Sequence, residues 1–257
     1  MSKVISIEDL TFSYNKRPVL KNISLQIDEG ESIGILGPNG SGKTTLLKLI
    51  SGILSGYSGK IEIFGKNINK FSRKELSQMI SYIPQNLNIN FDLLVETIVS
   101  FGRNPYIGLF KGLKKNDYIR IHNAMKEAEI THLKDRIFNT LSGGEKQRTS
   151  VAKSLAQDGN ILLLDEFVTH LDPGHAQKIL SLTKKLIDEK QMTSIGVFHD
   201  INRAINICHK LVFLKEGKIR EKITPENISE SLLKDIYEIQ IKIIDNPYTG
   251  KPYVITK

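Results

Sequence analysis

The 257-residue sequence contains a single cysteine, Cys208, which excludes an internal disulfide and agrees with a reducing cytosol. It contains no run of about 18 apolar residues, the length that a membrane-spanning helix requires. Residues 1–7 alternate instead of forming an apolar signal core, so export is not expected. With 40% apolar and 25% charged residues, the composition is ordinary for a soluble globular protein. The length suits one large domain or a core domain with a smaller lobe.

The sequence also lacks any block of basic residues longer than Lys114-Lys115 or Lys184-Lys185. Lysine and arginine number 36 against 28 acidic residues, which gives a net charge of +8. Such a charge suits nucleic acid, an anionic membrane surface, or a merely lysine-rich composition. Because the basic residues are spread along the chain, the last interpretation is favoured and no nucleic-acid partner is expected.

One stretch fits G-x-x-x-x-G-K-[ST], the phosphate-binding loop of nucleoside triphosphatases. It consists of Gly37, Pro38, Asn39, Gly40, Ser41, Gly42, Lys43, Thr44 and Thr45. Its glycines allow backbone N–H groups to turn inward on an anion, Lys43 can reach the β- and γ-phosphates, and Thr44 can hold Mg²⁺. An apolar strand at 32–36 precedes it and a helix follows, which places a helix N-terminus at the phosphate. A simple glycine-rich turn is the alternative.

β-structure is expected on both sides of this loop. Ile23, Leu25 and Ile27 alternate with polar residues, as in a half-buried strand, and residues 60–64 do the same. The phosphate loop is therefore flanked by an antiparallel layer. Tyr14 precedes the loop in sequence, and its ring can stack on a purine or pack against the sheet. Both interpretations stay open.

A helical pattern extends from residue 92 to residue 133, with apolar residues three and four apart. It is interrupted at 102–108, which is rich in turn residues and is expected to bend. The pattern indicates a helical insert between two halves of an α/β core.

Ser142 and Glu145 form S-x-x-E, a capping box, so a helix is predicted to begin at Gly143 and to continue through Ala156. With Gly144 in its first turn, this helix end is a second candidate anion site. Most capping boxes, however, only start helices.

Residues 161–166 are an unbroken apolar run that ends in Asp165 and Glu166. Such a run suits a central parallel strand, and ligands bind at the carboxyl ends of such strands. Asp165 then suits a Mg²⁺ ligand and Glu166 a base for an attacking water, although acids also end strands without a function. His199 follows the next apolar run, 194–198, and can donate to a γ-phosphate from the same edge.

The C-terminal part is expected to leave this core. Glu216-Gly217 is predicted to turn out of the core, and Thr224-Pro225 to begin a helix. Residues 239–244 and 253–255, joined by an Asn-Pro-Tyr-Thr-Gly segment, predict a small terminal hairpin.

In order and spacing these motifs resemble those of an ABC-type ATPase. The chain looks like the nucleotide-binding subunit of an ABC transporter over nearly its whole length. The resemblance implies an α/β P-loop NTPase fold, with a mostly parallel core sheet, an antiparallel β layer and a helical insert. It implies one ABC ATPase domain over 1–257, made of a core with the β layer (1–85 and 134–220), the insert (86–133) and a helix-and-hairpin extension (221–257).

The resemblance also implies roles for single residues, with ATP and Mg²⁺ as cofactors. Tyr14 would stack on adenine, and Lys43 and Thr44 would hold phosphates and Mg²⁺. Gln85, which follows Pro84, would sense Mg²⁺ and the attacking water. Asp165 would bind the metal, Glu166 would polarise the water, and His199 would contact the γ-phosphate.

The implied partners are a second copy and membrane subunits. Ser142, Gly143 and Gly144 belong to the motif that binds the γ-phosphate of ATP held by another copy, so the active unit resembles a head-to-tail homodimer, with Asp172 at the same interface. Permease subunits would contact Gln85 and the insert at the cytoplasmic face of the membrane, and an extracytoplasmic substrate-binding protein would act indirectly.

One segment departs from the family. The family usually continues after the catalytic glutamate with Pro-Thr-Ser or Pro-Thr-Ala, whereas this chain has Phe167-Val168-Thr169 and then His170-Leu171-Asp172. Loss of the proline frees φ, and Val168 removes a hydroxyl. Because both acids remain, hydrolysis is still expected, although a module that binds ATP without hydrolysis is an alternative.

Residues 102–106, Gly-Arg-Asn-Pro-Tyr, are similar to the Gly-Arg-x-Pro-His segment of importers for ferric siderophores, haem and cobalamin, with Tyr106 in place of the histidine. Residues 156–158 and 245–252 also look like that group. An importer for an oxyanion such as molybdate is an alternative. A soluble ABC ATPase acting on nucleic acid or ribosomes is another, but only residues 86–140 separate Gln85 from Leu141, too few for a long coiled-coil insertion.

Overall fold

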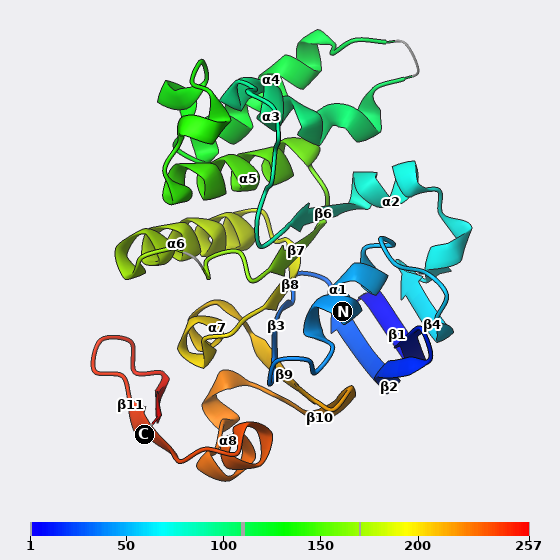
Figure 1. Cartoon of the computed structure of the whole chain (residues 1–257), viewed down its shortest axis with the longest axis vertical. Coiled ribbons are helices and arrows are strands. Elements are labelled where there is room, and N and C mark those ends of the chain that lie inside the picture. The colour runs from blue at the N-terminus through cyan, green and yellow to red at the C-terminus, as the bar shows by residue number, and fades with distance from the viewer. Residues whose placement is uncertain (1, 109–110, 170, 257) are drawn as a thin grey trace. The chain divides into compact units, whose positions relative to one another are not determined.

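The computed structural model describes residues 2–108, 111–169 and 171–256 (Figure 1). Contacts divide the chain into two compact units, one made of residues up to Lys70 and from Met192 onward, the other of Phe71–Gln191. His170, part of the segment that departs from the family, lies outside the described residues. The predicted subdivision into core, insert and extension stays a prediction. Within the described ranges, no helix is both long and apolar enough to cross a membrane.

The first unit combines long strands with short helices. Its elements before the phosphate loop are β1 (Lys3–Tyr14), β2 (Arg17–Asp28) and β3 (Ser32–Leu36). After the loop come α1 (Lys43–Ile50), β4 (Ser58–Ile63), β5 (Lys66–Asn67) and the 3₁₀ turn η1 (Ile68–Lys70). Its C-terminal part contains β8 (Thr193–Val197), α7 (Ile201–Ile207), β9 (Lys210–Lys215), β10 (Lys218–Ile223), η5 (Pro225–Asn227), α8 (Glu230–Tyr237), β11 (Ile241–Asp245) and β12 (Pro252–Thr256).

Two sheets of the first unit flank the phosphate loop. β2, β1, β4 and β5 form an antiparallel sheet in that order, and Ile23, Leu25 and Ile27 of β2 are buried, as their alternation predicts. β3 pairs in parallel with β8 and with β9, while β10 pairs antiparallel with β9. All of β3 is buried, as a central parallel strand requires. The predicted antiparallel layer beside a parallel core is therefore confirmed.

The second unit is mostly helical. Its elements are α2 (Arg73–Met79), β6 (Ile80–Ile83), α3 (Val95–Ser100), η2 (Phe101–Tyr106), α4 (Lys115–Glu127), η3 (Thr131–Leu133), η4 (Phe138–Thr140), α5 (Gly143–Gln157), β7 (Ile161–Asp165) and α6 (Pro173–Glu189). β6 and β7 pair in parallel, and β7 is buried throughout, as its unbroken apolar run predicts. Helices α3, α4 and α5 pack around a common core that includes Val99, Ile121 and Ala152 (Figure 1). The predicted helical region is thereby confirmed.

Three local predictions differ from the structure. The expected bend at 102–108 is mainly the 3₁₀ helix η2, whose tight turns accept the same glycine and proline. Thr224-Pro225 begins only the 3₁₀ turn η5, and the side chain of Thr224 accepts no capping hydrogen bond. Helix α8 begins after Ser229, whose hydroxyl accepts a hydrogen bond from the first turn of the helix. Glu216-Gly217 turns β10 back onto β9 instead of out of the core. The predicted terminal hairpin is present as β11 and β12.

Candidate functional site

The phosphate loop leaves the carboxyl end of β3 with a backbone that only glycine accepts. Gly37 has φ +145°, and a Cβ there would collide with the carbonyl oxygen of Leu214. Gly42 has φ +103° and caps α1, and its Cβ would lie 2.6 Å from Leu20 Cδ2. Side chains at these positions would clash with Leu214 and Leu20, so only glycine allows the loop to keep this conformation, in which backbone N–H groups can turn toward an anion.

Lys43 lies over this curl. Its ammonium donates to the carbonyl oxygens of Gly37 at 2.8 Å and Pro38 at 2.9 Å, and the residue is only 5% exposed. Ser41 Oγ is buried and has no hydrogen-bond partner within the described residues. A cradle closed to side chains, an adjacent ammonium and an unpaired buried hydroxyl fit a phosphate group.

His199 lies at the same sheet edge as the phosphate loop. β3 and β8 pair in parallel with Ile35 opposite Val197, so Gly37 and His199 both follow the carboxyl ends of adjacent strands. The backbone N–H of Phe198 donates to Ile35 O at 3.1 Å and fixes this exit. The structure thus brings the phosphate loop and His199 together within the first unit, as the sequence predicts.

Tyr14 ends β1 and remains 44% exposed. Its ring meets the ring of Phe12 edge-on, with centroids 4.8 Å apart. This contact fixes one edge and leaves much of the ring accessible. Stacking on adenine therefore stays a prediction.

Tyr237, at the end of α8, was missed by the sequence reasoning. Burial raises the pKa of its hydroxyl, and the neighbouring backbone of Gly37 partly opposes this rise. Its hydroxyl makes no well-aligned hydrogen bond within the part of the chain that the structure describes. No local pattern in the sequence links this C-terminal helix to the start of the phosphate loop.

In the second unit, Asp165 ends β7 and is held by Tyr82. The phenol donates to Asp165 Oδ2 at 2.7 Å, and Asp165 is 6% exposed. Burial and the hydrogen bond to Asp165 both raise the pKa of Tyr82, so the phenol remains a donor at neutral pH. Tyr82 was also missed, although its place on β6, opposite Leu163 of β7, puts it beside Asp165.

Glu166 follows in a left-handed conformation, with φ +49°. For a residue with a Cβ this costs about 1–2 kcal/mol, and such conformations cluster at functional sites. Gln85 Nε2 donates to Glu166 Oε2 at 3.1 Å. The structure therefore brings together Gln85 and Glu166, two of the residues predicted to be catalytic.

The segment that departs from the family, residues 167–169, stabilises the turn at Glu166 by packing and by hydrogen bonds. Phe167 is 1% exposed and Val168 4% exposed. Thr169 donates to the carbonyl oxygen of Glu166 from its backbone N–H at 3.1 Å and from its hydroxyl at 2.7 Å. Apolar packing and Thr169 thus restrict the freedom that loss of the proline would otherwise give.

The predicted capping box is present at the start of α5. Ser142 Oγ accepts from the backbone N–H of Glu145 at 3.4 Å, and the backbone N–H of Ser142 donates to Glu145 Oε2 at 2.8 Å. The hydroxyl of Ser142 also donates to Glu145 Oε2 at 2.7 Å, and these hydrogen bonds hold the pKa of Glu145 below its usual value. The ring of His175 lies against Gly144, where a Cβ would be 2.8 Å from its Cδ2.

Asp172 connects to the same region through His175. It caps α6 by accepting the backbone N–H groups of Gly174 and His175 at 3.1 Å each. Its other oxygen lies 2.6 Å from His175 Nδ1. The backbone N–H and the ring of His175 hold the pKa of Asp172 below its usual value.

The segment predicted to mark an importer group is anchored on α5. Arg103 is 4% exposed, pairs with Asp117 at 2.9 Å and donates to Ala156 O at 2.8 Å. The ring of Tyr106 lies 3.9 Å from the Arg103 guanidinium carbon, and its hydroxyl donates to Gln157 O at 2.9 Å. Tyr106, which replaces the usual histidine, therefore has a defined contact.

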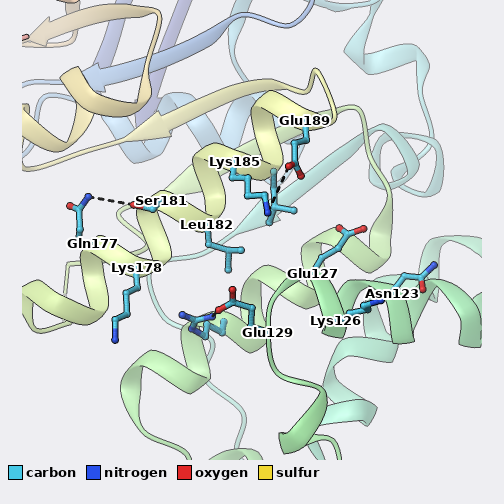
Figure 2. A pocket seen from close by; sticks show the side chains of 12 residues that line it. Asn123, Lys126, Glu127, Glu129, Gln177, Lys178, Ser181, Leu182, Lys185 and Glu189 are labelled. Atoms are coloured by element: carbon cyan, nitrogen blue, oxygen red, sulfur yellow. Dashed lines mark hydrogen bonds and ion pairs between the residues drawn. The ribbon is translucent and has the colours of Figure 1, made fainter. Parts of the chain in front are cut away.

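The described residues of the second unit line a cavity and a groove. A cavity of about 590 Å³ is lined by Gln85, Gly143 and Phe167, among other residues. A groove of about 930 Å³ between α4, α5 and α6 contains none of the predicted site residues (Figure 2). Some of the charges that line this groove are paired, for example Lys185 with Glu189 at 3.8 Å (Figure 2). Among the described residues, no three His, Cys, Asp or Glu side chains form a metal cluster.

Comparison with known proteins agrees with these features. The sequence profile of the family described as "ABC transporter" matches residues 20–169. The ferric enterobactin transport ATP-binding protein FepC of Escherichia coli (strain K12) is 38% identical over 249 residues, which cover 96% of this chain and 92% of that protein. The iron(3+)-hydroxamate import ATP-binding protein FhuC of Bacillus subtilis (strain 168) is 34% identical over 98% of this chain and 94% of its own.

Solved structures show the same fold. A chain from a transporter assigned to the metal-chelate ABC type, in an inward-facing conformation, aligns with a TM-score of 0.88 and 28% identity over 100% of this chain and 98% of its own. The dimeric bacterial ABC transporter cassette MJ0796 aligns with a TM-score of 0.74 and 29% identity over 86% of this chain and 98% of that one. The predicted ABC cassette fold is confirmed.

Proposed function

Because the chain belongs to the ABC transporter family, whose ATP-binding domains hydrolyse ATP, we propose that it energises an importer for an iron chelate (a siderophore or haem) or cobalamin. The observation that carries this proposal is the similarity of this chain to siderophore import ATP-binding proteins. Each of these matches covers more than nine-tenths of this chain and of the relative. The anchored segment at 102–106 adds support, because its sequence is similar to the Gly-Arg-x-Pro-His segment of this importer group.

ATP is held by the first unit. The phosphate loop, 37–45, surrounds the phosphates with backbone N–H groups, and Lys43 adds a positive charge. Tyr14 offers an accessible ring for adenine. Mg²⁺, when bound, neutralises charge on the phosphates, and the hydroxyl of Thr44 and the carboxylate of Asp165 are oxygen ligands of the kind it prefers.

Glu166 is the base that accepts a proton from the attacking water. Gln85 orients this carboxylate through its hydrogen bond and, in our proposal, contacts the same water. Tyr82 fixes Asp165, and His199 donates to the γ-phosphate from the edge that carries the phosphate loop. These groups position and stabilise charge, which is most of what phosphoryl transfer requires of a protein.

The active form is a head-to-tail homodimer. Gly143 and Gly144 begin α5 with backbone N–H groups that have no acceptor within the helix, and together with Ser142 they complete the ATP site of the second copy. Asp172 lies at the same interface. The dimeric cassette MJ0796, which shares this fold, supports the proposal.

Permease subunits dock beside Gln85. The cavity lined by Gln85 is also lined by Asn86, Asn88, Asn90 and Asn139, whose amides can bind the backbone of a partner segment. The chain therefore works at the cytoplasmic face of the membrane, and a substrate-binding protein on the outer side acts through the permease.

The test is uptake by vesicles that contain a permease of the iron-chelate or cobalamin importer type, loaded with ATP and the purified chain. We expect ATP-dependent uptake of one ferric siderophore, haem or cobalamin, and no uptake with the Glu166→Gln variant. Uptake of molybdate alone, or an ATPase activity that responds to nucleic acid or ribosomes and not to the permease, would contradict the proposal.

A further inference from the structure

The terminal hairpin, β11 and β12, is bonded to the helix that follows His199. Asn202 of α7 donates from Nδ2 to Val254 O at 2.9 Å, and the N–H of Val254 donates to Asn202 Oδ1 at 2.7 Å. The side-chain amide thus pairs with Val254 as the peptide group of a neighbouring strand does. Val254 is 6% exposed, so both hydrogen bonds are shielded from water.

The same hairpin also holds the other end of α7. Lys251 Nζ donates to the carbonyl oxygens of Ile205 at 3.1 Å and Asn206 at 3.5 Å, in the last turn of the helix. Carbonyls in the last turn lack partners within the helix and lie at its negative end, so an ammonium group stabilises them. The hairpin therefore makes hydrogen bonds with both ends of α7, and Figure 1 shows it beside this helix.

The hairpin is itself fixed. Asn246 Oδ1 accepts from the N–H of Tyr248 at 2.9 Å, and Asn246 O accepts from Gly250 at 2.8 Å, which closes the turn. From the middle of β11, the N–H of Ile243 donates to Glu230 Oε1 of α8 at 3.0 Å. Because the hairpin is fixed in this way, it can restrain α7, the helix against which it packs.

Helix α7 needs such a restraint because it has only seven residues. Isolated helices shorter than about 12–15 residues are marginal in water. Its first turn depends on Asp200, which accepts the N–H groups of Asn202 at 2.9 Å and Arg203 at 3.3 Å. His199 directly precedes this cap, so fraying of the first turn changes where its ring points.

We propose that the terminal hairpin braces the loop that carries His199, and that Asn202 is the positioning residue through which it acts. This inference rests on the role proposed above for His199 in hydrolysis. It gives the C-terminal extension a function within the ATP site: the extension keeps the His199 side chain in the orientation that meets the γ-phosphate.

The first test replaces Asn202 by alanine in the full chain. We expect kcat for ATP hydrolysis to fall by about 5–30-fold, as loss of two buried hydrogen bonds implies. The KM for ATP and the affinity for a non-hydrolysable ATP analogue should stay unchanged, because the phosphate loop is built on β3 and α1. Asn206→Ala is the matched control. It also removes a side-chain amide from α7, but the hydrogen bond that this amide donates, to Asn202 O, lies within the helix and not between the helix and the hairpin. Equal kcat values for Asn202→Ala and the control would overturn the inference.

A second pair of variants guards against a folding defect in Asn202→Ala. Lys251→Met removes the ammonium and keeps most of the apolar stem, and we expect a smaller fall in kcat, about threefold. Lys242→Met makes the same change on the exposed part of β11 and should match the wild type. If Lys251→Met also matches the wild type, the hairpin does not brace the helix.

The decisive measurement combines Asn202→Ala with His199→Ala. If Asn202 acts through His199, the double variant has the kcat of His199→Ala alone, because the two effects are not additive. If the fold reductions in kcat of the two single variants instead multiply in the double variant, Asn202 does not act through His199 and the inference is overturned. The role proposed for His199 itself would then be unaffected. A normal kcat for His199→Ala by itself would instead contradict the role that the proposed function gives to His199.

Discussion

Gln85 donates a hydrogen bond to Glu166 at 3.1 Å, across 81 residues of sequence. The donor follows β6 and the acceptor follows β7, and these two strands pair in parallel. The residue beside which the permease is proposed to dock and the residue proposed to activate water are therefore one hydrogen-bonded pair. Movement of Gln85 by a docked partner would alter the orientation of the base directly.

Replacing Glu166 by glutamine tests the base. Glutamine keeps the size of the side chain but cannot accept the proton, so turnover should fall by roughly 10²–10⁴-fold while ATP binding persists. Phosphate release and equilibrium binding of ATP measure the two effects. Glu189→Gln, an exposed position at the end of α6, is the control and should behave as the wild type. Unchanged turnover in Glu166→Gln would remove Glu166 from this role.

Replacing Lys43 by alanine tests the phosphate loop. The loss of charge-assisted hydrogen bonds to phosphate should weaken ATP binding by about 10²-fold or more. Lys48→Ala, in the last turn of the same helix, controls for the loss of a lysine from α1. Calorimetric titration with ATP decides the matter, and tight binding by Lys43→Ala would contradict the assignment.

Replacing Tyr82 by phenylalanine tests the support of Asp165. Without the phenol, the carboxylate loses a 2.7 Å hydrogen bond that orients it. Residues that hydrogen-bond to a metal ligand typically contribute about 10–100-fold to metal affinity. The Mg²⁺ concentration for half-maximal hydrolysis should therefore rise by about tenfold or more. Tyr118→Phe, at an exposed position on α4, should leave the Mg²⁺ dependence unchanged. The same dependence in both variants would show that Tyr82 does not support the metal site.

Replacing Phe167 by alanine tests the segment that departs from the family. Phe167 is 1% exposed, so its truncation should lower the free energy of unfolding by about 3–5 kcal/mol. Phe91 is 73% exposed, and Phe91→Ala should change it by less than about 0.5 kcal/mol. Urea denaturation compares the two variants. Similar stabilities would mean that packing of Phe167 does not replace the missing proline.

Much of this site could be predicted from sequence because its signals are local. The phosphate loop combines glycines, a lysine and a threonine within nine positions, and the capping box at Ser142 and Glu145 spans a single turn. The buried strands β3 and β7 could likewise be predicted, because each is a short run of apolar residues in the sequence. Each of these patterns needs only its own neighbours to form.

The rest of the site depends on residues distant in the chain. Tyr82 and Asp165 are 83 residues apart, and Asn202 and Val254 are 52 apart. Such hydrogen bonds leave no periodic pattern, since one tyrosine on a strand or one asparagine on a helix has many other uses. Helix η2 was predicted as a bend for a different reason, because 3₁₀ helices and open turns use the same glycine and proline.

In the proposed homodimer, one chain carries only part of each working ATP site. The ATPase rate at a series of protein concentrations tests this. We predict that the rate per chain falls on dilution and reaches a plateau at high concentration, because two copies must meet before Ser142 and Gly144 complete a site. A total rate strictly proportional to protein concentration down to high dilution would show that a single chain hydrolyses ATP by itself, which contradicts the proposed dimer.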